Sequence, residues 1–201
     1  MSESKIVVWG DSIPASGPNS WPETAEFIYN NFTNVGRTVK VINSSVGGKP
    51  AARAVNEFEE RVAQFHPELV FIQFGFNDMR YDGKRGQKPI SSVPEFGAHI
   101  REMIEDCKSI GAKVIVIGNH RPSTVITLPD GKSFAKKIFE YNNAAKEAAL
   151  ASKAVYFDMA EADIPGGSWF DLVCDDCVHL SEFGRSIYGQ YAANLIYEYL
   201  K

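Results

Sequence analysis

The chain has 201 residues, of which 44% are hydrophobic and 23% are charged, and its formal net charge is −4 at pH 7. This length suits a single domain over residues 1–201 that buries about two-thirds of the surface of its unfolded chain. The lack of a basic surplus argues against nucleic acid as a partner, and no run approaches the ~20 apolar residues that a membrane span needs.

In chain order, the hydrophobic pattern predicts a strand at 6–9, a helix at 21–32, a strand at 38–42, a helix at 50–65, a strand at 69–74, a helix at 94–110, a strand at 113–117, a helix at 136–152, a strand at 154–157 and a helix at 181–200. Ser20 and Ser181 stand where the N-caps of the first and last helices belong. Strands separated by helices indicate an α/β fold, a three-layer α/β/α sandwich around a five-stranded parallel sheet. A flavodoxin-like strand order is the natural candidate, although the sequence does not fix it.

The first residues, MSESKIVVWG, lack the basic region and the apolar core of about 7–15 residues that mark a secretory signal peptide. We therefore expect a cytoplasmic protein, although a chain whose leader has been removed looks the same. Three cysteines, an odd number in a chain of this size, do not predict a disulfide framework. We expect reduced thiols.

Small or polar residues follow each predicted strand. They are Asp11 and Ser12 after the first strand, residues 43–48 after the second, Asn77 and Asp78 after the third, Asn119 and His120 after the fourth, and Asp176 and His179 in the segment after the fifth. In open α/β sheets the ligand crevice lies at the carboxyl ends of the strands, so segments far apart in the sequence converge there. The chemistry on offer is a hydroxyl nucleophile, a histidine to act as its base, a carboxylate to orient that histidine, and donors for an oxyanion.

Four blocks in this order resemble those of the SGNH (GDSL-like) hydrolase superfamily: Gly10-Asp11-Ser12, a glycine after the second strand, Gly75-x-Asn77-Asp78 and Asp176-x-x-His179. The resemblance runs from residue 6 to the final helix. It departs from the family pattern at Ile13, where leucine is usual, and at the pair Gly47-Gly48, which leaves the oxyanion glycine ambiguous.

The resemblance implies a flavodoxin-like SGNH hydrolase fold and a serine esterase that needs no cofactor and no metal. It implies that Ser12 attacks the ester carbonyl, that His179 acts as the general base and that Asp176 orients the ring of His179. The backbone N–H groups of Ser12 and Gly48 and the side-chain amide of Asn77 would form the oxyanion hole. Spacing from Asn43 favours Gly48 for this role, and Gly47 would then serve the backbone shape of the turn.

Simpler interpretations of these residues stay open. Ser12 is also a common cap or turn residue, and Asn77 and Asp78 are common turn formers. Asp175 competes with Asp176 as the acid, although the i, i+3 spacing to the histidine favours Asp176. We expect Asp78 to brace its loop by hydrogen bonds.

The remaining histidines and cysteines carry weaker signals. We interpret His66 and His99 as surface or packing residues, while His120 either contacts substrate or has a plain loop role. Cys174 and Cys177 form a C-x-x-C pair, but a zinc site needs two more ligands. A reversible disulfide is a second possibility, and unpaired packing cysteines are favoured.

The segments that flank the expected site, residues 79–93 and 121–134, are rich in charged and turn-forming residues and do not resemble an amphipathic lid. Long-chain lipid substrates are therefore disfavoured, and we expect a small-molecule or carbohydrate ester, with acetyl as the leading acyl group. Within the second segment, Val125, Ile126 and Leu128 are the apolar cluster that would contradict this if it folded over the site. Trp169 and Phe170 either line the pocket, where they would stack on a sugar, or pack under their loop.

Two other classes of function use the same residues. An acyltransferase would keep the site and replace water by an alcohol or sugar. A non-enzymatic flavodoxin-like module would bind a flavin or phosphate in the loop 11–20, but this leaves Asp176 and His179 unexplained, and the sequence has no Walker A and no G-x-G-x-x-G motif.

Overall fold

The computed structural model describes residues 3–33, 35–83 and 88–200. Within them a parallel sheet has five strands: β1 (Glu3–Gly10), β2 (Thr38–Asn43), β3 (Leu69–Gln73), β4 (Lys113–Gly118) and β5 (Val155–Asp158). The strands lie in the order β2-β1-β3-β4-β5, which confirms the flavodoxin-like arrangement. In this order the carboxyl ends of β1, β3 and β4 are adjacent, so the loops that follow them meet at one edge of the sheet.

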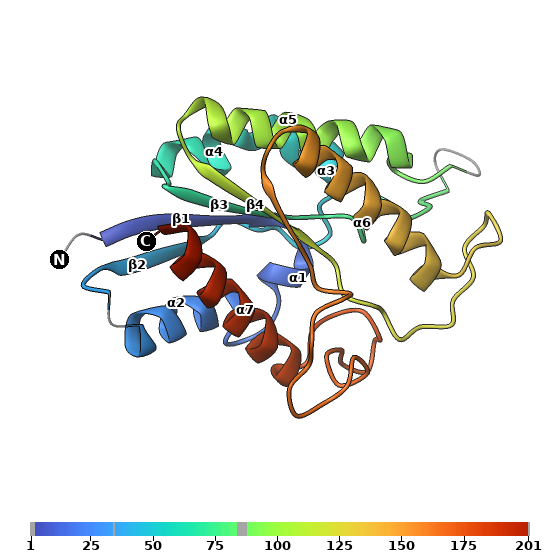
Figure 1. The fold of residues 1–201 in the computed structure, drawn as a ribbon. Helices are drawn as coiled ribbons and strands as arrows, with labels where there is room; N and C mark the ends of the chain where they lie inside the picture. The colour runs from blue at the N-terminus through green and yellow to red at the C-terminus, as the bar shows by residue number, and fades with distance from the viewer. Residues whose placement is uncertain (1–2, 34, 84–87, 201) are drawn as a thin grey trace.

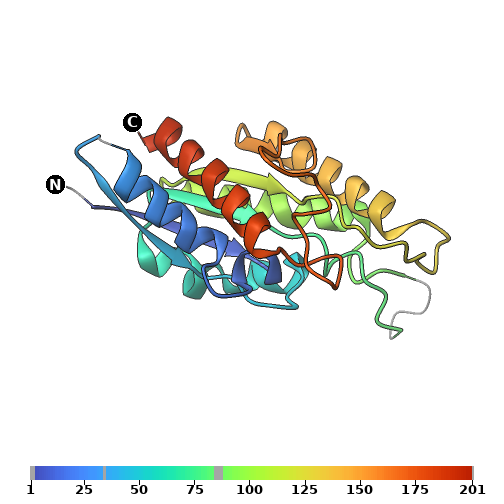
Figure 2. The ribbon, with the colours of Figure 1, turned by 90° about the horizontal axis from the view of Figure 1, so that it is seen from below.

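Helices cover both faces of the sheet, as the sequence predicts (Figure 1). One face carries α2 (Trp21–Phe32) and α7 (Glu182–Leu200), which lie side by side in Figure 2. The other face carries α5 (Val93–Ser109) and α6 (Phe134–Ala151) together with the short helices α3 (Ala51–Ala54) and α4 (Phe58–Arg61). Both faces of the central strands are thus covered, and every residue of β3 is buried. No helix within the described residues is both long and apolar enough to span a bilayer.

The predicted helix over residues 50–65 is wrong in one respect, because the structure breaks it into four short pieces. A 3₁₀ turn at Val55–Glu57 separates α3 from α4, and a second 3₁₀ turn follows at Ala63–Phe65. The breaks fall at Glu57 and Val62, whose φ/ψ values of −112°/18° and −133°/−61° depart from the α region. Val62 is β-branched and fully buried, so the chain bends here to place it in the core at the cost of regular helix.

A one-turn helix, α1 (Ser12–Ala15), follows β1 directly and was not predicted from the sequence. Asp11 is its N-cap, and the side-chain Oδ1 accepts a hydrogen bond of 2.9 Å from the Ile13 N–H. Gly10 before it is required by close packing, because a Cβ at this position would lie 2.8 Å from the Gln73 carbonyl oxygen. The strand therefore turns sharply into a helix and presents Ser12 at the sheet edge.

Candidate active site

The loop after β2 continues to pair with β1 and so comes to rest beside Ser12. The Ser44 and Val46 N–H groups donate to the carbonyls of Val8 and Gly10 at 2.9 and 3.0 Å. The Asn43 side-chain amide also donates to the Pro14 carbonyl of α1 at 2.7 Å. These bonds hold the loop after β2 against the end of β1 and against α1.

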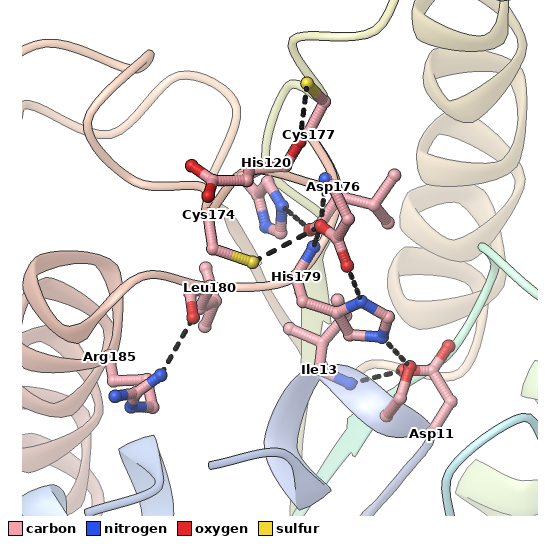
Figure 3. Close-up of polar contacts among 12 residues, drawn as sticks. Asp11, Ile13, His120, Cys174, Asp176, Cys177, His179, Leu180 and Arg185 are labelled. Carbon is pink, nitrogen blue, oxygen red and sulfur yellow. Dashed lines mark hydrogen bonds and ion pairs between the residues drawn. The ribbon is translucent and has the colours of Figure 1, made fainter.

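Ser12, His179 and Asp176 form one hydrogen-bonded chain (Figure 3). The Ser12 Oγ lies 2.8 Å from the His179 Nε2, and the opposite ring nitrogen, Nδ1, lies 2.5 Å from the Asp176 Oδ2. Ser12 and His179 are half-buried, so the hydroxyl is within reach of a substrate. This is the arrangement in which a histidine accepts a serine proton while a carboxylate fixes its tautomer.

The Asp176 carboxylate is held in its ionised form by several donors. Partial burial opposes ionisation, but hydrogen bonds from the His179 ring and from the Val178 and His179 backbone N–H groups lower the pKa of Asp176 well below its usual range. The Cys174 thiol adds a further contact to Oδ1 at 3.3 Å. The carboxylate is therefore charged at neutral pH and faces the His179 ring.

The segment 174–180 is a compact turn whose backbone is anchored at several points. The Cys174 N–H donates to the His179 carbonyl at 2.9 Å, and the Cys177 N–H donates to the Cys174 carbonyl at 2.8 Å. Cys177 has a left-handed φ of +66°, which closes the turn. From α7, the Arg185 Nη1 donates to the Leu180 carbonyl at 2.9 Å (Figure 3). The acid and the histidine thus sit on a braced loop.

Asn77 is buried beside Ser12, and its side-chain amide has partners at both ends. Its Nδ2 donates to the Asp11 Oδ2 at 3.3 Å, and its Oδ1 accepts from the Arg80 Nη1 at 3.4 Å. These two contacts assign the amide orientation and leave one Nδ2 proton for another acceptor. Asn77 is therefore more than a turn former. The sequence did not predict that Asp11 would hold the Asn77 amide. The position of Asp11 immediately before Ser12 is the signal that could have indicated a contact in the site.

Asp11 is fully buried, and this environment changes its titration. Burial raises the pKa of Asp11 to about 7, while the hydrogen bonds from the Ile13 N–H and the Asn77 amide oppose the rise. The nearby Asp78 carboxylate also contributes to the rise. A protonated carboxyl is thus available near neutral pH at the base of the site.

Asp78 braces the neighbouring loops, as expected. Its Oδ2 accepts from the Ala51 N–H at 3.0 Å and its Oδ1 accepts from the Ser91 hydroxyl at 2.9 Å, which joins the start of α3 to the segment before α5. Asp175 differs from Asp11, Asp78 and Asp176. Its side chain is exposed and has no hydrogen-bond partner among the described residues, so the structure brings Asp176 and not Asp175 to His179.

The two glycines after β2 differ in conformation. Gly48 has a left-handed φ of +74°, so the backbone shape of the turn requires glycine at Gly48 and not at Gly47, contrary to expectation. Gly47 faces Ser12, because a Cβ built on Gly47 would lie 3.8 Å from the Ser12 Cβ. The part that the Gly48 N–H plays in an oxyanion hole stays a prediction.

A small cavity of about 230 Å³ opens over the Ser12 hydroxyl. Its walls are formed by Ser12, Phe76, Asn77, Arg80, Phe134, Asp176, Val178 and His179. Val125 and Ile126 are 95% and 57% exposed and do not line it, so this apolar cluster does not cover the site. The sequence did not predict that Arg80 lines the cavity, because it was considered only as one charge of its loop. Its position three residues after Asn77 is the signal that could have indicated it.

Trp169 and Phe170 stack on each other, with ring centroids 3.7 Å apart, and do not line the cavity over Ser12. Trp169 instead borders a separate cavity of about 300 Å³ together with Arg121 and Glu161. This larger cavity is lined by neither Ser12 nor His179, which both border the smaller one.

The other histidines and the cysteines do not line the cavity over Ser12. His120 is fully buried and lies outside the wall of the cavity over Ser12, so its side chain has no direct access to that cavity. His66 has a left-handed φ of +51° and ends a 3₁₀ turn, and His99 lies within α5. Cys107, Cys174 and Cys177 are free thiols. The described residues contain no group of three or more His, Cys, Asp or Glu side chains that suits a metal ion.

Comparison with known proteins agrees with this geometry. The sequence profile of the GDSL-like Lipase/Acylhydrolase family matches residues 8–187. Among characterised proteins, Esterase TesA of Pseudomonas aeruginosa is 27% identical over 118 residues, which cover 58% of this chain and 55% of TesA, so the match spans about half the length of that relative.

Among solved structures, a lipase/acylhydrolase from Enterococcus faecalis has a TM-score of 0.79 at 23% identity, covering 96% of this chain and 95% of its own. Axe2, an acetylxylan esterase from Geobacillus stearothermophilus, has a TM-score of 0.72 at 16% identity, covering 98% and 94%. Esterase EstA from Pseudoalteromonas has a TM-score of 0.73 at 18% identity, covering 98% of each chain. These likenesses show that the fold is the SGNH hydrolase fold.

Proposed function

We propose that this chain, which belongs to the GDSL-like lipase/acylhydrolase family, is a carboxylic ester hydrolase that cleaves short-chain acyl esters by serine catalysis. The observation that carries the proposal is the hydrogen bond of 2.8 Å between the Ser12 Oγ and the His179 Nε2, with Asp176 on the other side of the ring. A serine hydroxyl is a weak nucleophile at neutral pH, and this contact supplies the base that it needs.

In the proposed reaction the Ser12 Oγ attacks the ester carbonyl carbon while its proton moves to the His179 Nε2. The tetrahedral intermediate collapses when the imidazolium returns this proton to the departing alcohol, which leaves an acyl group on Ser12. A water molecule then enters, gives one proton to His179 and attacks the acyl carbon. The carboxylic acid leaves as Ser12 regains its proton.

Throughout both steps, the ionised Asp176 stabilises the imidazolium. The charge that develops on the carbonyl oxygen needs donors fixed in advance, and the proposed donors are the Ser12 N–H, the Gly48 N–H and the Asn77 Nδ2–H. The second proton of the Asn77 amide points away to Asp11, so the amide needs no rearrangement to serve an oxyanion. In other serine hydrolases, removing one such donor costs about 3–4 kcal/mol of transition-state stabilisation.

The size of the cavity limits the acyl group that the site accommodates. At about 230 Å³ it suits an acetyl to butyryl group beside the rings of Phe76 and Phe134, with the alcohol part directed toward solvent. The polar loops around it suit a hydroxylated leaving group, and the fold likeness to an acetylxylan esterase agrees with an O-acetylated carbohydrate as the substrate class.

The test is a p-nitrophenyl ester series from acetyl to decanoyl, measured beside a panel of O-acetylated sugars. The proposal expects kcat/KM to peak at short acyl groups and acetate to be released from at least one sugar ester. Product analysis with competing alcohols identifies acyl transfer, which would appear as new esters in place of free acid. Failure of Ser12→Ala to abolish activity on every ester would contradict the proposed mechanism.

A further inference from the structure

His120 is a fully buried ionisable side chain that the proposed mechanism does not use. It follows β4 and lies beneath the loop that carries the acid and the histidine of the site. Its Nε2 lies 2.8 Å from the Val178 carbonyl oxygen, and its Nδ1 lies 2.8 Å from the Tyr188 hydroxyl on α7 (Figure 3 shows the first contact). Two good contacts on a buried ring mean that its orientation is fixed.

The surrounding donors also determine where the proton on the His120 ring lies. The Tyr188 hydroxyl accepts hydrogen bonds from the His120 backbone N–H at 3.2 Å and from the Gln73 Nε2 at 3.4 Å. Its own proton is therefore directed to the His120 Nδ1, so the ring proton is on Nε2 and is donated to the Val178 carbonyl. Burial lowers the pKa of His120 to about 4, which keeps this ring neutral under ordinary conditions.

The Val178 carbonyl belongs to the peptide unit that leads into His179. This unit is planar, and its N–H, which is the backbone N–H of His179, donates to the Asp176 Oδ1 at 2.8 Å. The peptide plane is thus held at its oxygen by His120 and at its nitrogen by Asp176. The orientation of this plane sets the direction in which the His179 side chain leaves the backbone, and so the position of its Nε2 relative to Ser12.

We propose that His120 is a positioning residue for His179, acting through the Val178–His179 peptide rather than by contact with substrate. This inference rests on the proposed serine mechanism. Without the His120 donor the peptide plane is free to tilt, and the His179 Nε2 then departs from its 2.8 Å contact with the Ser12 Oγ. Displacements of about 1 Å at reacting atoms cost on the order of 10²-fold in rate.

The support for His120 extends into the core of the fold. Gln73, at the end of β3, donates to Tyr188 and accepts a hydrogen bond of 3.2 Å from the Trp21 Nε1. Trp21, Gln73 and Tyr188 are all buried, so this chain of polar contacts has no water to replace a lost partner. The catalytic loop is thereby tied to the central strand and to both helices of one face of the sheet.

Two substitutions at this position separate positioning from packing. In His120→Gln, the side-chain nitrogen stands the same number of bonds from the backbone as the His Nε2, so it still reaches the Val178 carbonyl. In His120→Asn, the side chain keeps an acceptor for Tyr188 but no longer reaches that carbonyl. On a p-nitrophenyl acetate assay, we expect kcat to fall roughly 10- to 100-fold in His120→Asn with KM within about twofold, and to recover to within about threefold of the wild type in His120→Gln.

A second pair of variants protects the test against loss of fold. Tyr188→Phe removes the proton donated to the His120 Nδ1, and we expect it to lower kcat as His120→Asn does. Because both substitutions act on the same contact, the kcat of the double variant His120→Asn/Tyr188→Phe should be little below that of His120→Asn alone. Tyr141→Phe is the matched control, because it also removes a fully buried tyrosine hydroxyl, here one bonded to the Ser91 carbonyl, outside the site. It should lower Tm and leave kcat within about twofold.

The proton NMR signal of the His179 Nδ1–H gives a readout that loss of stability does not move. In His120→Asn this signal should shift or broaden, whereas in Tyr141→Phe it should stay unchanged. Equal activity in the two His120 variants, or losses of kcat that follow Tm in all variants, would overturn the inference. If the wild type shows no Ser12-dependent esterase activity, the proposed function fails instead, so the two failures are distinguishable.

Discussion

The carboxylate of Asp176 contacts His179 at two places: Oδ2 lies 2.5 Å from the ring Nδ1, and Oδ1 lies 2.8 Å from the backbone nitrogen. One side chain therefore orients both the imidazole and the peptide from which it extends. This double contact depends on the i, i+3 turn of the segment 174–180. Substitution of Asp176 and of the neighbouring Asp175 should therefore affect activity differently.

Asp176→Asn should lower kcat by on the order of 10³- to 10⁴-fold, because an amide at this position favours the wrong tautomer of His179. Asp175→Asn should change kcat by less than about threefold, since the Asp175 side chain is exposed and has no partner among the described residues. The two purified variants are compared on p-nitrophenyl acetate with matched Tm values. A reversed ranking would mean that the acid is assigned to the wrong residue.

Ser12→Ala should leave a folded protein whose esterase activity is reduced by on the order of 10³-fold or more. A fluorophosphonate probe should label Ser12 in the wild type, as seen by peptide mass spectrometry. Ser16 lies near the end of the same short helix, so Ser16→Ala is the matched control and should label normally. Labelling that persists in Ser12→Ala at another serine would refute the assignment of the nucleophile.

Asp11→Asn should change the pH dependence of stability. The pKa of Asp11 is raised from 3.8 to about 7, so between these values the folded protein retains a proton that the unfolded chain has released. The Asp11 contribution to the free energy of unfolding is therefore full below about pH 4 and is lost as pH rises through 7. Asn has no such loss, and the stability of Asp11→Asn relative to the wild type should rise across this window by on the order of a few kcal/mol.

The measurement is Tm of both proteins from pH 4 to pH 8. The difference between them removes the contribution of His120, whose lowered pKa acts in both proteins, and reports Asp11 together with its coupling to Asp78. A difference in Tm that does not depend on pH would show that Asp11 is ionised throughout this range in the folded state.

Reducing agent should change activity by less than about twofold, because Cys174 and Cys177 are free thiols. Cys174→Ser keeps a donor near the Asp176 Oδ1, which the thiol reaches at 3.3 Å, and should retain activity within about threefold. Activity is measured with and without dithiothreitol and after mild peroxide. A reversible loss on oxidation that is absent in Cys174→Ser would instead indicate a disulfide that distorts the loop of Asp176.

The acyl-length profile should be highest from acetyl to butyryl and should fall by octanoyl. Each added methylene contributes up to ~0.8 kcal/mol only where apolar surface receives it. The cavity of about 230 Å³ offers Phe76, Phe134 and Val178, while the exposed Val125 and Ile126 lie outside its wall. A kcat/KM that keeps rising through decanoyl would show that the loop 121–134 closes over the substrate and receives the chain.

The elements that the sequence predicted best are those with a strong local signal. The helix Trp21–Phe32 has the bounds expected for it, and Ser181 caps α7 through a hydrogen bond of 3.0 Å to the Gly184 N–H. The prediction for residues 50–65 was less accurate, because helical periodicity is a local pattern whereas the break at Val62 places a fully buried side chain in the core. Helix α1 was not predicted, because a single turn has too few residues to show a helical hydrophobic period.

The sequence by itself determined the fold class and the residues that meet at the sheet edge. Hydrophobic periods, helix caps and the order of the four blocks are local patterns that can be recognised without the tertiary structure. It also favoured Asp176 over Asp175 through spacing alone. Only the tertiary structure decided which glycine carries the left-handed turn, that Asp11 holds Asn77, and that His120 supports the Val178 carbonyl from below. Those hydrogen bonds join residues far apart in the sequence, with a separation of 66 for Asp11 and Asn77 and of 58 for His120 and Val178. A contact of this kind leaves no local pattern, because it arises when parallel strands bring separate loops to one edge.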